Sequence, residues 1–347
     1  MHALELKNIN VSFSARQVLN SISLQVNDGE IICLLGPSGG GKTTLLRTIA
    51  GFQTIEDGEV WIAGNKYSDN KVNVAVEKRR LGMVFQDYAL FPHLTARENI
   101  CFGIYQLAKP EQDQKIETLS ELLDMKSFID LYPHQLSGGQ QQRVAIARAM
   151  APEPKLLLLD EPFSSMDVEL RELLARDLRR VFKTAGITVI MVSHNQHEAF
   201  AMADRIGLIN GGSLQQLDSA FGLYHRPNNE FVADFIGEGV FLDAVVIDEH
   251  CVDTKLGLLK GNTQHGYKAG ESVRVFVRPD DILHDDESEK TAVVIDKVFR
   301  GAEFLYTLAI NGQEQVLSLV PSHHDHPVNE AIGIRLEIEH LVVFPAK

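Results

Sequence analysis

A glycine-rich octapeptide constrains this chain more than any other feature of its sequence. Gly36-Pro37-Ser38-Gly39-Gly40-Gly41-Lys42-Thr43 fits the pattern G-x-x-x-x-G-K-[ST], directly after the apolar run 30–35 and before a stretch of helical spacing that ends at Gly51. Glycines let backbone N–H groups surround phosphate oxygens, and a helix N-terminus adds a favourable dipole. The octapeptide therefore predicts a loop that binds a nucleoside triphosphate, with Lys42 at the β- and γ-phosphates and the Thr43 hydroxyl on Mg²⁺. A plain glycine-rich turn is the alternative.

The rest of the first 240 residues has the pattern of an α/β fold. Residues 4–13 and 22–26 alternate apolar and polar side chains, which predicts half-buried strands that pair antiparallel. Strand-like apolar runs return at 156–159 and 187–192, and residues 95–150 have helical spacing. Strands and helices in alternation predict a parallel sheet. The expected fold is a P-loop nucleotide hydrolase core with an antiparallel β subdomain and a helical insertion at about 92–150.

The pattern changes after about residue 240, where short alternating runs are separated by Gly, Asn and Asp turns. Examples are residues 273–277, 306–310 and 315–320. Such runs predict a small β-barrel or sandwich. The expected domains are a nucleotide-binding domain at 1–237 and a β-rich domain at 238–347. The family resemblance given below implies that the second domain is a small barrel of the oligonucleotide-binding type with a regulatory or dimerisation role.

Charge and composition exclude several classes of partner. The 347 residues carry 33 Lys and Arg against 47 Asp and Glu, a net charge of −14. Nucleic-acid binding through a broad basic face is therefore not expected. No run of 18 apolar residues and no signal-peptide pattern occurs, and the three cysteines are far apart, which predicts a cytosolic protein recruited to any membrane by partners.

A pair of carboxylates supplies the second half of the predicted site. Asp160 and Glu161 follow the apolar run 156–159, at the end of a strand where open α/β sheets bind ligands. Asp160 suits the coordination shell of Mg²⁺, and Glu161 suits a general base that polarises the attacking water. An apolar run that ends in two acids is common by itself, so this prediction depends on the phosphate loop.

The third motif is Leu136-Ser137-Gly138-Gly139-Gln140-Gln141-Gln142-Arg143, just before a predicted helix. Ser137 is either an ordinary helix cap or part of a second anion-binding helix N-terminus. Together the three motifs resemble the ATP-binding-cassette ATPases over residues 1 to about 235. In that family the Ser-Gly-Gly signature of one subunit closes on the γ-phosphate of the ATP held by the other. The resemblance implies a homodimer that hydrolyses ATP with Mg²⁺.

The resemblance also implies roles for single residues. Phe13 stands where the family stacks an aromatic ring on adenine, with a strand core residue as the alternative; Gln86 matches the glutamine that contacts Mg²⁺; and His194 matches the histidine that hydrogen-bonds the γ-phosphate. Residues 164–167 match the segment that contacts the other subunit. The predicted catalytic residues are Glu161, His194 and Lys42. The predicted ATP-binding residues are Phe13, Gly36, Pro37, Ser38, Gly39, Gly40, Gly41, Lys42, Thr43, Thr44, Gln86, Ser137, Gly138, Gly139 and Gln140, and the predicted Mg²⁺ ligands are Thr43, Gln86 and Asp160.

Two further segments resemble importer ATPases within that family. Tyr88-Ala89-Leu90-Phe91-Pro92-His93-Leu94-Thr95 is similar to the groove that receives a coupling helix from a membrane permease, although a simple helix start is the alternative. Val277-Arg278-Pro279-Asp280-Asp281-Ile282 looks like a motif of the C-terminal domain in importers of maltose, polyamines, sulfate and ferric iron. The resemblance implies integral permease subunits, a periplasmic solute-binding protein as indirect partner, and a peripheral location on the cytoplasmic face of the bacterial inner membrane.

Ferric iron is the predicted solute, from the resemblance of residues 235–239 and 341–345 to ferric-cation importers. Sulfate, polyamine, thiamine or a sugar remain alternatives with the same ATPase role. A soluble cassette ATPase without a transport function and a nucleotide-sensing regulator with negligible turnover are the alternatives from other classes. His323-His324-Asp325-His326 could suggest an iron site. Because adjacent ligands on one loop rarely converge on one metal, we predict a solvated polar turn there instead.

Overall fold

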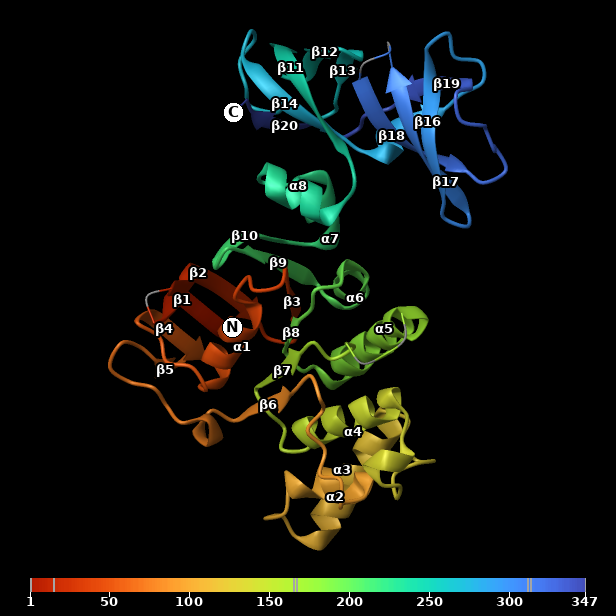
Figure 1. Ribbon diagram of the computed structural model, residues 1–347. Coiled ribbons are helices and arrows are strands. Elements are labelled where there is room, and N and C mark those ends of the chain that lie inside the picture. The colour runs from red at the N-terminus through yellow and green to blue at the C-terminus, as the bar shows by residue number, and fades with distance from the viewer. Residues whose placement is uncertain are drawn as a thin grey trace. The chain divides into compact units, whose positions relative to one another are not determined.

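The computed structural model describes residues 2–14, 16–164, 166, 168–310, 312 and 314–346, except the side chains of residues 168–170. The chain divides into two compact units, residues 1–220 and 221–347, which are described separately below (Figure 1). This boundary lies before the one predicted at 237 and 238. The helix at Glu230–Ile236 belongs with the second unit, because Ala233 packs against Phe276 and Phe344 in a small apolar cluster there.

A six-stranded sheet forms the centre of the first unit, in the order β10-β9-β3-β8-β7-β6. Neighbouring strands from β9 to β6 are parallel, and only β10 runs antiparallel to its neighbour. The strands are β3 (Ile31–Leu35), β6 (Leu81–Val84), β7 (Leu156–Asp160), β8 (Val189–Val192), β9 (Arg205–Asn210) and β10 (Ser213–Asp218). Every residue of β3, β7 and β8 is buried, which explains why these strands are continuous apolar runs in the sequence.

Helices α1 (Lys42–Ala50), α5 (Val168–Ala185) and α6 (Gln196–Met202) accompany this sheet. A second, antiparallel sheet has the order β2-β1-β4-β5. Its strands are β1 (His2–Phe13), β2 (Arg16–Asn27), β4 (Asp57–Ile62) and β5 (Asn65–Ser68). Leu4 and Leu6 of β1 share one apolar core with Leu45 of α1 and Leu158 of β7, so the two sheets are packed together through α1.

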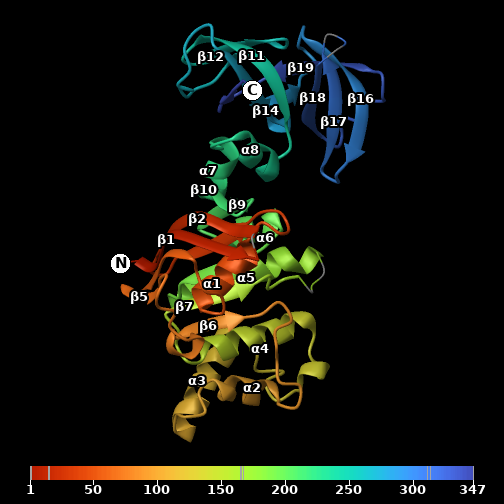
Figure 2. The same cartoon turned by 60° about the vertical axis from the view of Figure 1, so that its left-hand side comes forward.

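The chain leaves the parallel sheet after β6 and returns to it as the neighbouring strand β7, with Leu81 paired to Leu156. The elements in between are α2 (Ala96–Phe102), α3 (Lys109–Leu122), the short 3₁₀ helix η2 (Pro133–Gln135) and α4 (Gly138–Met150) (Figure 2). Another 3₁₀ helix, η1 (Val76–Lys78), precedes β6. The three α-helices thus form an insertion at one edge of the sheet.

Arg79 holds the end of α1 in place. Its fully buried guanidinium group donates hydrogen bonds to the carbonyl oxygens of Ile49 and Thr48 in the last turn of α1, at 2.9 and 3.3 Å. It also donates to Val74 O at 2.9 Å and to the Ser68 hydroxyl at 2.6 Å. Helix α1 ends at Gly51, which has a positive φ of 93° and would clash with Arg79 if it carried a Cβ atom.

The second unit contains two five-stranded sheets around one apolar core, in the orders β13-β12-β11-β14-β20 and β15-β19-β16-β17-β18. All its strand pairs are antiparallel. The strands are β11 (Val240–Asp248), β12 (Cys251–Thr254), β13 (Gly257–Lys260), β14 (Ser272–Val277), β15 (Ile282–His284), β16 (Thr291–Phe299), β17 (Glu303–Ile310), β18 (Glu314–Pro321), β19 (Ala331–Leu336) and β20 (Val342–Pro345). Helix α7 (Ala220–His225) starts at the boundary, and α8 (Glu230–Ile236) and the 3₁₀ helix η3 (Pro279–Asp281) complete the unit.

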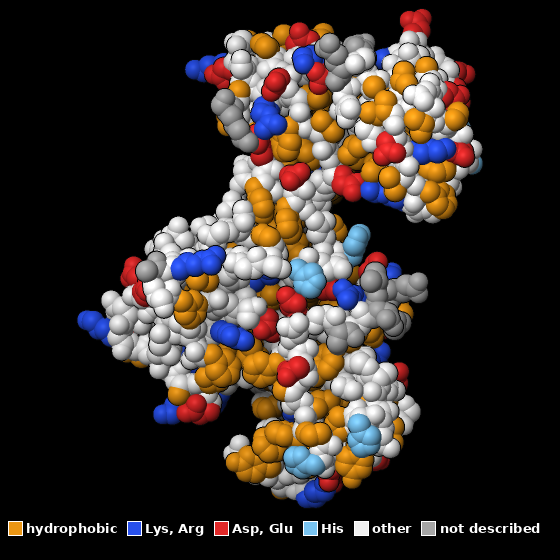
Figure 3. Space-filling model, viewed as in Figure 1, with side chains coloured by type: hydrophobic (Ala, Val, Ile, Leu, Met, Phe, Trp, Pro, Cys, Tyr) orange, Lys and Arg blue, Asp and Glu red, His pale blue; other side chains and the backbone are white. Residues whose placement is uncertain are grey.

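These features confirm the predicted fold: a P-loop α/β core with an antiparallel β subdomain and a helical insertion, followed by a small, nearly closed β-barrel. Within the part of the chain that the structure describes, no helix is both long and apolar enough to cross a membrane. On the face in Figure 3, Lys and Arg side chains are scattered among Asp and Glu rather than gathered into a basic patch.

Candidate functional site

The glycine-rich loop connects β3 to α1 and borders a cavity of about 730 Å³, within the size range of ligand pockets. Gly36 and Gly41 have positive φ values of 149° and 101°. A Cβ atom on Gly36 would stand 2.0 Å from the carbonyl oxygen of Ile209, and one on Gly41 would stand 2.8 Å from that of Val18. Only glycine fits these two positions, because the loop passes close to β9 and β2 at the start of α1.

Lys42 is the first residue of α1 and is only 6% exposed. Its ammonium group donates hydrogen bonds to the carbonyl oxygens of Gly36 and Pro37, at 2.8 and 2.9 Å, within the loop itself. Burial lowers the pKa of Lys42, and the negative charges of Glu161 and Asp160 oppose that shift. The positive charge is therefore fixed among the residues that line the cavity.

Two carboxylates stand at the carboxyl end of β7, as the sequence predicts for a strand that ends at a ligand site. Asp160 is 7% exposed, and the Thr43 hydroxyl donates a hydrogen bond to its Oδ1 at 3.2 Å. Burial raises the pKa of Asp160, while the hydrogen bond from Thr43 lowers it. Thr43 and Asp160 together present oxygen atoms, the ligands that Mg²⁺ prefers, so these two residues fit the predicted metal.

Glu161, the residue after Asp160, lines the cavity. Its backbone has a φ of 45°, a left-handed conformation that few residues other than glycine adopt. The Glu161 N–H donates to Val192 O at 3.1 Å, and its carbonyl oxygen accepts from the Ser164 hydroxyl at 3.0 Å. Backbone strain of this kind gathers at functional positions. His194, which follows β8, places its Nδ1 3.3 Å from Glu161 Oε2.

Phe13 lies at the end of β1 and lines the same cavity, with 48% of its surface exposed. It is therefore not a core residue of the strand. Ser38, Gly39, Gly40 and Thr44 also line the cavity. Gln86 is exposed in the turn after β6, the outer strand of the sheet, and is not among the residues that line this cavity.

The Ser-Gly-Gly motif is located elsewhere. Ser137 caps α4: its hydroxyl accepts from Gln140 N at 3.3 Å, and Gln140 Oε1 accepts from Ser137 N at 2.9 Å. Ser137, Gly138, Gly139 and Gln140 line a second cavity of about 460 Å³ with Met166. Within one chain the structure thus does not bring this motif to the phosphate loop. Of the segment 164–167, Ser165 and Asp167 lie outside the described residues.

The segment 88–95 is held by residues that the sequence analysis missed. Arg148 of α4 donates to the carbonyl oxygens of Tyr88 and Ala89, at 2.8 and 2.6 Å, and both these residues have positive φ values. Asn99 of α2 accepts from Phe91 N at 2.9 Å and donates to Phe91 O at 3.2 Å. Both residues belong to helices that sequence periodicity locates, but nothing in the pattern pairs them with this segment.

The end of segment 88–95 is also a helix start, as the simpler interpretation holds. Thr95 caps α2 in a reciprocal pair of hydrogen bonds with Glu98. Phe91 packs on Phe102 with ring centroids 4.5 Å apart, and Phe102 and Tyr105 are more than half exposed. An apolar surface therefore borders segment 88–95, in the region of α2 where orange side chains group in Figure 3.

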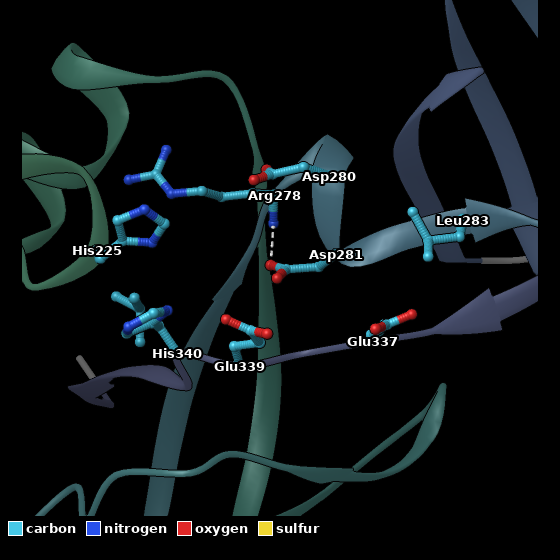
Figure 4. Close-up of a pocket in the computed structure, with 9 residues that line it drawn as sticks. His225, Arg278, Asp280, Asp281, Leu283, Glu337, Glu339 and His340 are labelled. Carbon is cyan, nitrogen blue, oxygen red and sulfur yellow. Dashed lines mark hydrogen bonds between the residues drawn. The ribbon is translucent and has the colours of Figure 1, made fainter. Parts of the chain in front are cut away.

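The second unit contains its own cavity, of about 240 Å³, where the segment Val277–Ile282 turns through η3 (Figure 4). Arg278 is almost fully buried, with its guanidinium group 3.7 Å from the ring centroid of Tyr224. The Arg278 N–H donates to Asp281 Oδ2 at 2.8 Å, and Glu337 and Glu339 line the same cavity. Burial raises the pKa of Asp281 to about 7.

Comparison with known proteins agrees with both units. The ABC transporter family model matches residues 19–164, and the TOBE domain model matches residues 275–344. The spermidine/putrescine import ATP-binding protein PotA of Lawsonia intracellularis is 40% identical over 333 residues, covering 90% of this chain and 88% of that protein. The PotA protein of Haemophilus influenzae is 37% identical over 350 residues, covering 95% of this chain and 93% of its own length.

Two solved structures resemble the first unit. One is the dimeric structure of MJ0796, a bacterial ABC transporter cassette, with a TM-score of 0.55 and 30% sequence identity. The other is a dimeric post-hydrolysis state of the same cassette bound to ADP and Pi, with a TM-score of 0.54. Each match covers 62% of this chain and 98% of the other.

Proposed function

We propose that this chain drives the uptake of polyamines. It belongs to the ABC transporter family, as an importer ATP-binding subunit with a C-terminal TOBE domain. ATP is the nucleotide that the family uses. The observation that carries the chemical part of the proposal is the convergence of Lys42, Thr43, Asp160, Glu161 and His194 at the carboxyl ends of three adjacent parallel strands.

Each of these side chains has a role that its surroundings favour. Lys42 holds the β- and γ-phosphates, since its ammonium group already lies among the backbone atoms of the glycine-rich loop. Thr43 and Asp160 hold Mg²⁺, which neutralises phosphate charge when it is bound. Glu161 accepts a proton from the attacking water, and His194 contacts the γ-phosphate beside it. Phe13 stacks on adenine with its exposed ring.

The remaining predicted residues belong to a site shared between two chains. In the proposed homodimer, Ser137, Gly138, Gly139 and Gln140 of one subunit close on the ATP held by the other. This explains why the cavity at Ser137 and the cavity at Lys42 have no lining residue in common. Both solved structures that resemble the first unit are dimeric. Gln86, which follows the strand β6 beside β7, is proposed as a further ligand of Mg²⁺.

Segment 88–95 is the proposed docking site for the permease. It joins the parallel sheet to the helical insertion, and Arg148 and Asn99 couple its backbone to α4 and α2. A movement of the helices on nucleotide binding would therefore move this segment. The subunit would be peripheral, on the cytoplasmic face of the inner membrane, beneath a permease that receives solute from a periplasmic binding protein.

The proposed solute replaces the ferric iron predicted from the sequence. The relatives named above are spermidine and putrescine importers, and they support the polyamine alternative better than ferric iron. The resemblance of residues 235–239 and 341–345 to ferric-cation importers does not distinguish iron import from polyamine import, because the permease and the binding protein select the solute.

Uptake by a deletion strain tests this proposal. We expect the strain to lose uptake of radiolabelled spermidine and putrescine and to keep uptake of Fe³⁺, sulfate, thiamine and maltose. The wild-type chain should restore polyamine uptake and the Glu161→Gln chain should not. Loss of Fe³⁺ uptake with normal polyamine uptake would instead restore the iron hypothesis.

A further inference from the structure

Three histidines meet in the second unit, far from the predicted ATP site in the sequence. His284 is the last residue of β15, while His324 and His326 lie in the loop between β18 and β19. One ring nitrogen from each lies within 4.8 Å of the other two. The ring centroid of His284 is 4.8 Å from that of His324 and 4.8 Å from that of His326. Two separate segments of the chain therefore direct imidazole groups to one point.

Two ring nitrogens of these histidines have no hydrogen-bond partner. Nε2 of His284 and Nε2 of His326 are both buried and unpaired among the residues that the structure describes. The His284 side chain is only 6% exposed, and buried polar groups are normally hydrogen-bonded. The Asp286 carboxylate lies 3.1 Å from His284 Nε2, but the two groups are not aligned as a hydrogen bond. Two buried ring nitrogens thus remain open to a ligand.

Glu330 fixes the orientation of one of these rings. Its Oε2 lies 3.1 Å from Nδ1 of His326, and because a carboxylate only accepts, Nδ1 must carry the proton. The lone pair of the buried Nε2 is then free to bind a ligand. Histidines that bind metals almost always donate their second N–H to a carboxylate or carbonyl group in this way.

The loop that carries His324 and His326 is held by its backbone. The fully buried Tyr306 hydroxyl donates to His324 O and accepts from His326 N, both at 2.9 Å. Lys297 donates to His326 O at 3.1 Å and pairs with Asp325. Asp325 is therefore directed to Lys297, and the alternate residues His324 and His326 face His284.

We propose that His284, His324 and His326 form a binding site for a divalent transition-metal ion such as Zn²⁺. Imidazole nitrogen suits Zn²⁺ and its neighbours in the first transition row, and does not suit Mg²⁺ or Ca²⁺. Tetrahedral Zn–N bonds of about 2.0–2.1 Å place ligand nitrogens about 3.4 Å apart, so the rings need to approach by at most about 1.5 Å.

This site differs from the solvated polar turn predicted from the sequence. That prediction fits His323, which is exposed, and fails for His324 and His326, which turn inward. The ligand that completes the set, His284, comes 40 residues earlier in the chain, where no local motif marks it. The bound ion would connect β15 to the loop after β18 and so stabilise the second unit, independently of the proposed transport function.

Metal titration of the full-length chain tests this site. The chain, freed of metal with a chelator, is titrated with Zn²⁺ in competition with a coloured chelator. We expect the wild type to bind one more Zn²⁺ per chain than the variants His284→Ala and His326→Ala. The matched control His323→Ala, which removes the exposed neighbouring histidine, should keep that ion. Co²⁺ in place of Zn²⁺ should give the visible absorption of a low-coordinate site in the wild type and in His323→Ala, but not in His284→Ala or His326→Ala.

Two readouts keep the result clear if an alanine variant folds poorly. Glu330→Gln keeps all three ligands and should weaken Zn²⁺ binding about 10- to 100-fold. Zn²⁺ should raise the Tm of the second unit in the wild type and in His323→Ala, while Mg²⁺ at the same concentration should not. Equal Zn²⁺ stoichiometry and affinity in the wild type, His284→Ala and Glu330→Gln would overturn the proposal and leave the three rings as a packed cluster only.

Discussion

Glu161 and His194 face each other across the carboxyl ends of two paired strands, with Oε2 of the glutamate 3.3 Å from Nδ1 of the histidine. Pairing of Asp160 with Val192 in the parallel ladder of β7 and β8 sets this distance. Glu161, which has a left-handed backbone, lines the cavity. The geometry of the proposed catalytic pair is therefore a property of the sheet.

Replacing Glu161 by glutamine should separate ATP binding from hydrolysis. Gln keeps the size of the side chain and removes the proton acceptor, so we expect turnover to fall about 10²- to 10⁴-fold with ATP affinity unchanged. Phosphate release and equilibrium binding of labelled ATP measure the two quantities. Glu172→Gln, at an exposed position on α5, is the matched control and should turn over normally. Undiminished turnover in Glu161→Gln would exclude Glu161 as the base.

Mixed dimers should show whether the site is shared between subunits. If Lys42→Ala is in one subunit and Ser137→Ala in the other, both defects fall in one composite site and the second site stays intact. With both changes in the same subunit, each site carries one defect. We therefore expect nucleotide trapping at one site in the first arrangement and at none in the second. The opposite pattern would place the complete site within a single chain.

Ser137→Ala also removes a helix cap, which costs about 1 kcal/mol in a typical helix. Thr95→Ala is the matched control, because Thr95 caps α2 through the same reciprocal pair of hydrogen bonds. Both variants should lose similar stability in urea, and only Ser137→Ala should lose turnover in the isolated protein.

Removal of the Phe13 ring should weaken ATP binding and leave triphosphate binding unchanged. Stacking of an aromatic ring on a base contributes about 1–3 kcal/mol, so Phe13→Ala should raise the Kd for ATP about 5- to 150-fold. Phe13→Tyr should restore affinity. Phe52→Ala, an exposed phenylalanine that does not line the cavity, is the control. Equal weakening of ATP and inorganic triphosphate would mean that Phe13 acts on the loop instead of on adenine.

Arg79→Met should destabilise the first unit by about 3 kcal/mol. The variant leaves the carbonyl oxygens of Thr48, Ile49 and Val74 buried without the hydrogen bonds that Arg79 donates. Urea unfolding followed by fluorescence of Trp61, the single tryptophan, measures this change in the unit that contains both residues. Arg80→Met, at the exposed neighbouring position, should change stability by less than about 0.5 kcal/mol. Similar midpoints for the two variants would contradict the proposed role of Arg79.

The second unit should lose stability between pH 4 and pH 7 because of Asp281. Burial raises its pKa from 3.8 to about 7, so the folded state binds a proton that the unfolded state has released. The contribution of this proton to the free energy of unfolding is complete below pH 4 and is lost as the pH rises through about 7. The free energy of unfolding then falls by at most about 4 kcal/mol.

Asp281→Asn should flatten this pH dependence, because asparagine cannot ionise and still accepts the hydrogen bond from Arg278 N. At pH 8 the variant should be more stable than the wild type. Urea unfolding of the second unit at pH 5, 6, 7 and 8 measures both effects. Asp243→Asn, at an exposed position on β11, should keep the slope of the wild type. A wild-type slope in Asp281→Asn would assign the pH dependence to another group.

The predictions from sequence succeed where one local segment contains the whole signal. The loop 36–43 and the pair Asp160 and Glu161 are marked by glycine, lysine and carboxylates beside apolar strands. The structure brings residues 38–43 and Glu161 to one cavity, and Asp160 accepts a hydrogen bond from Thr43 beside it. Arg79, Asn99 and Arg148 carry no such mark. Their partners are backbone carbonyl and N–H groups of distant segments, which the sequence does not distinguish from any others.

His284 illustrates the same limit. His284 has no motif around it, and only the pairing of β15 with β19 brings it near His326. A side chain whose position depends on long-range strand pairing cannot be located from local pattern alone.

The departure of the chain at Val84 and its return at Leu156, as adjacent parallel strands in fixed register, has an evolutionary consequence. Because the two ends of the insertion are joined through the ladder, its length and surface can change without altering the spacing between Lys42 and Glu161. The part that is proposed to contact the permease can then diverge, or be exchanged between relatives, as a separate insertion. Selection for a new permease and selection for ATP chemistry can thus act on separate stretches of the same gene.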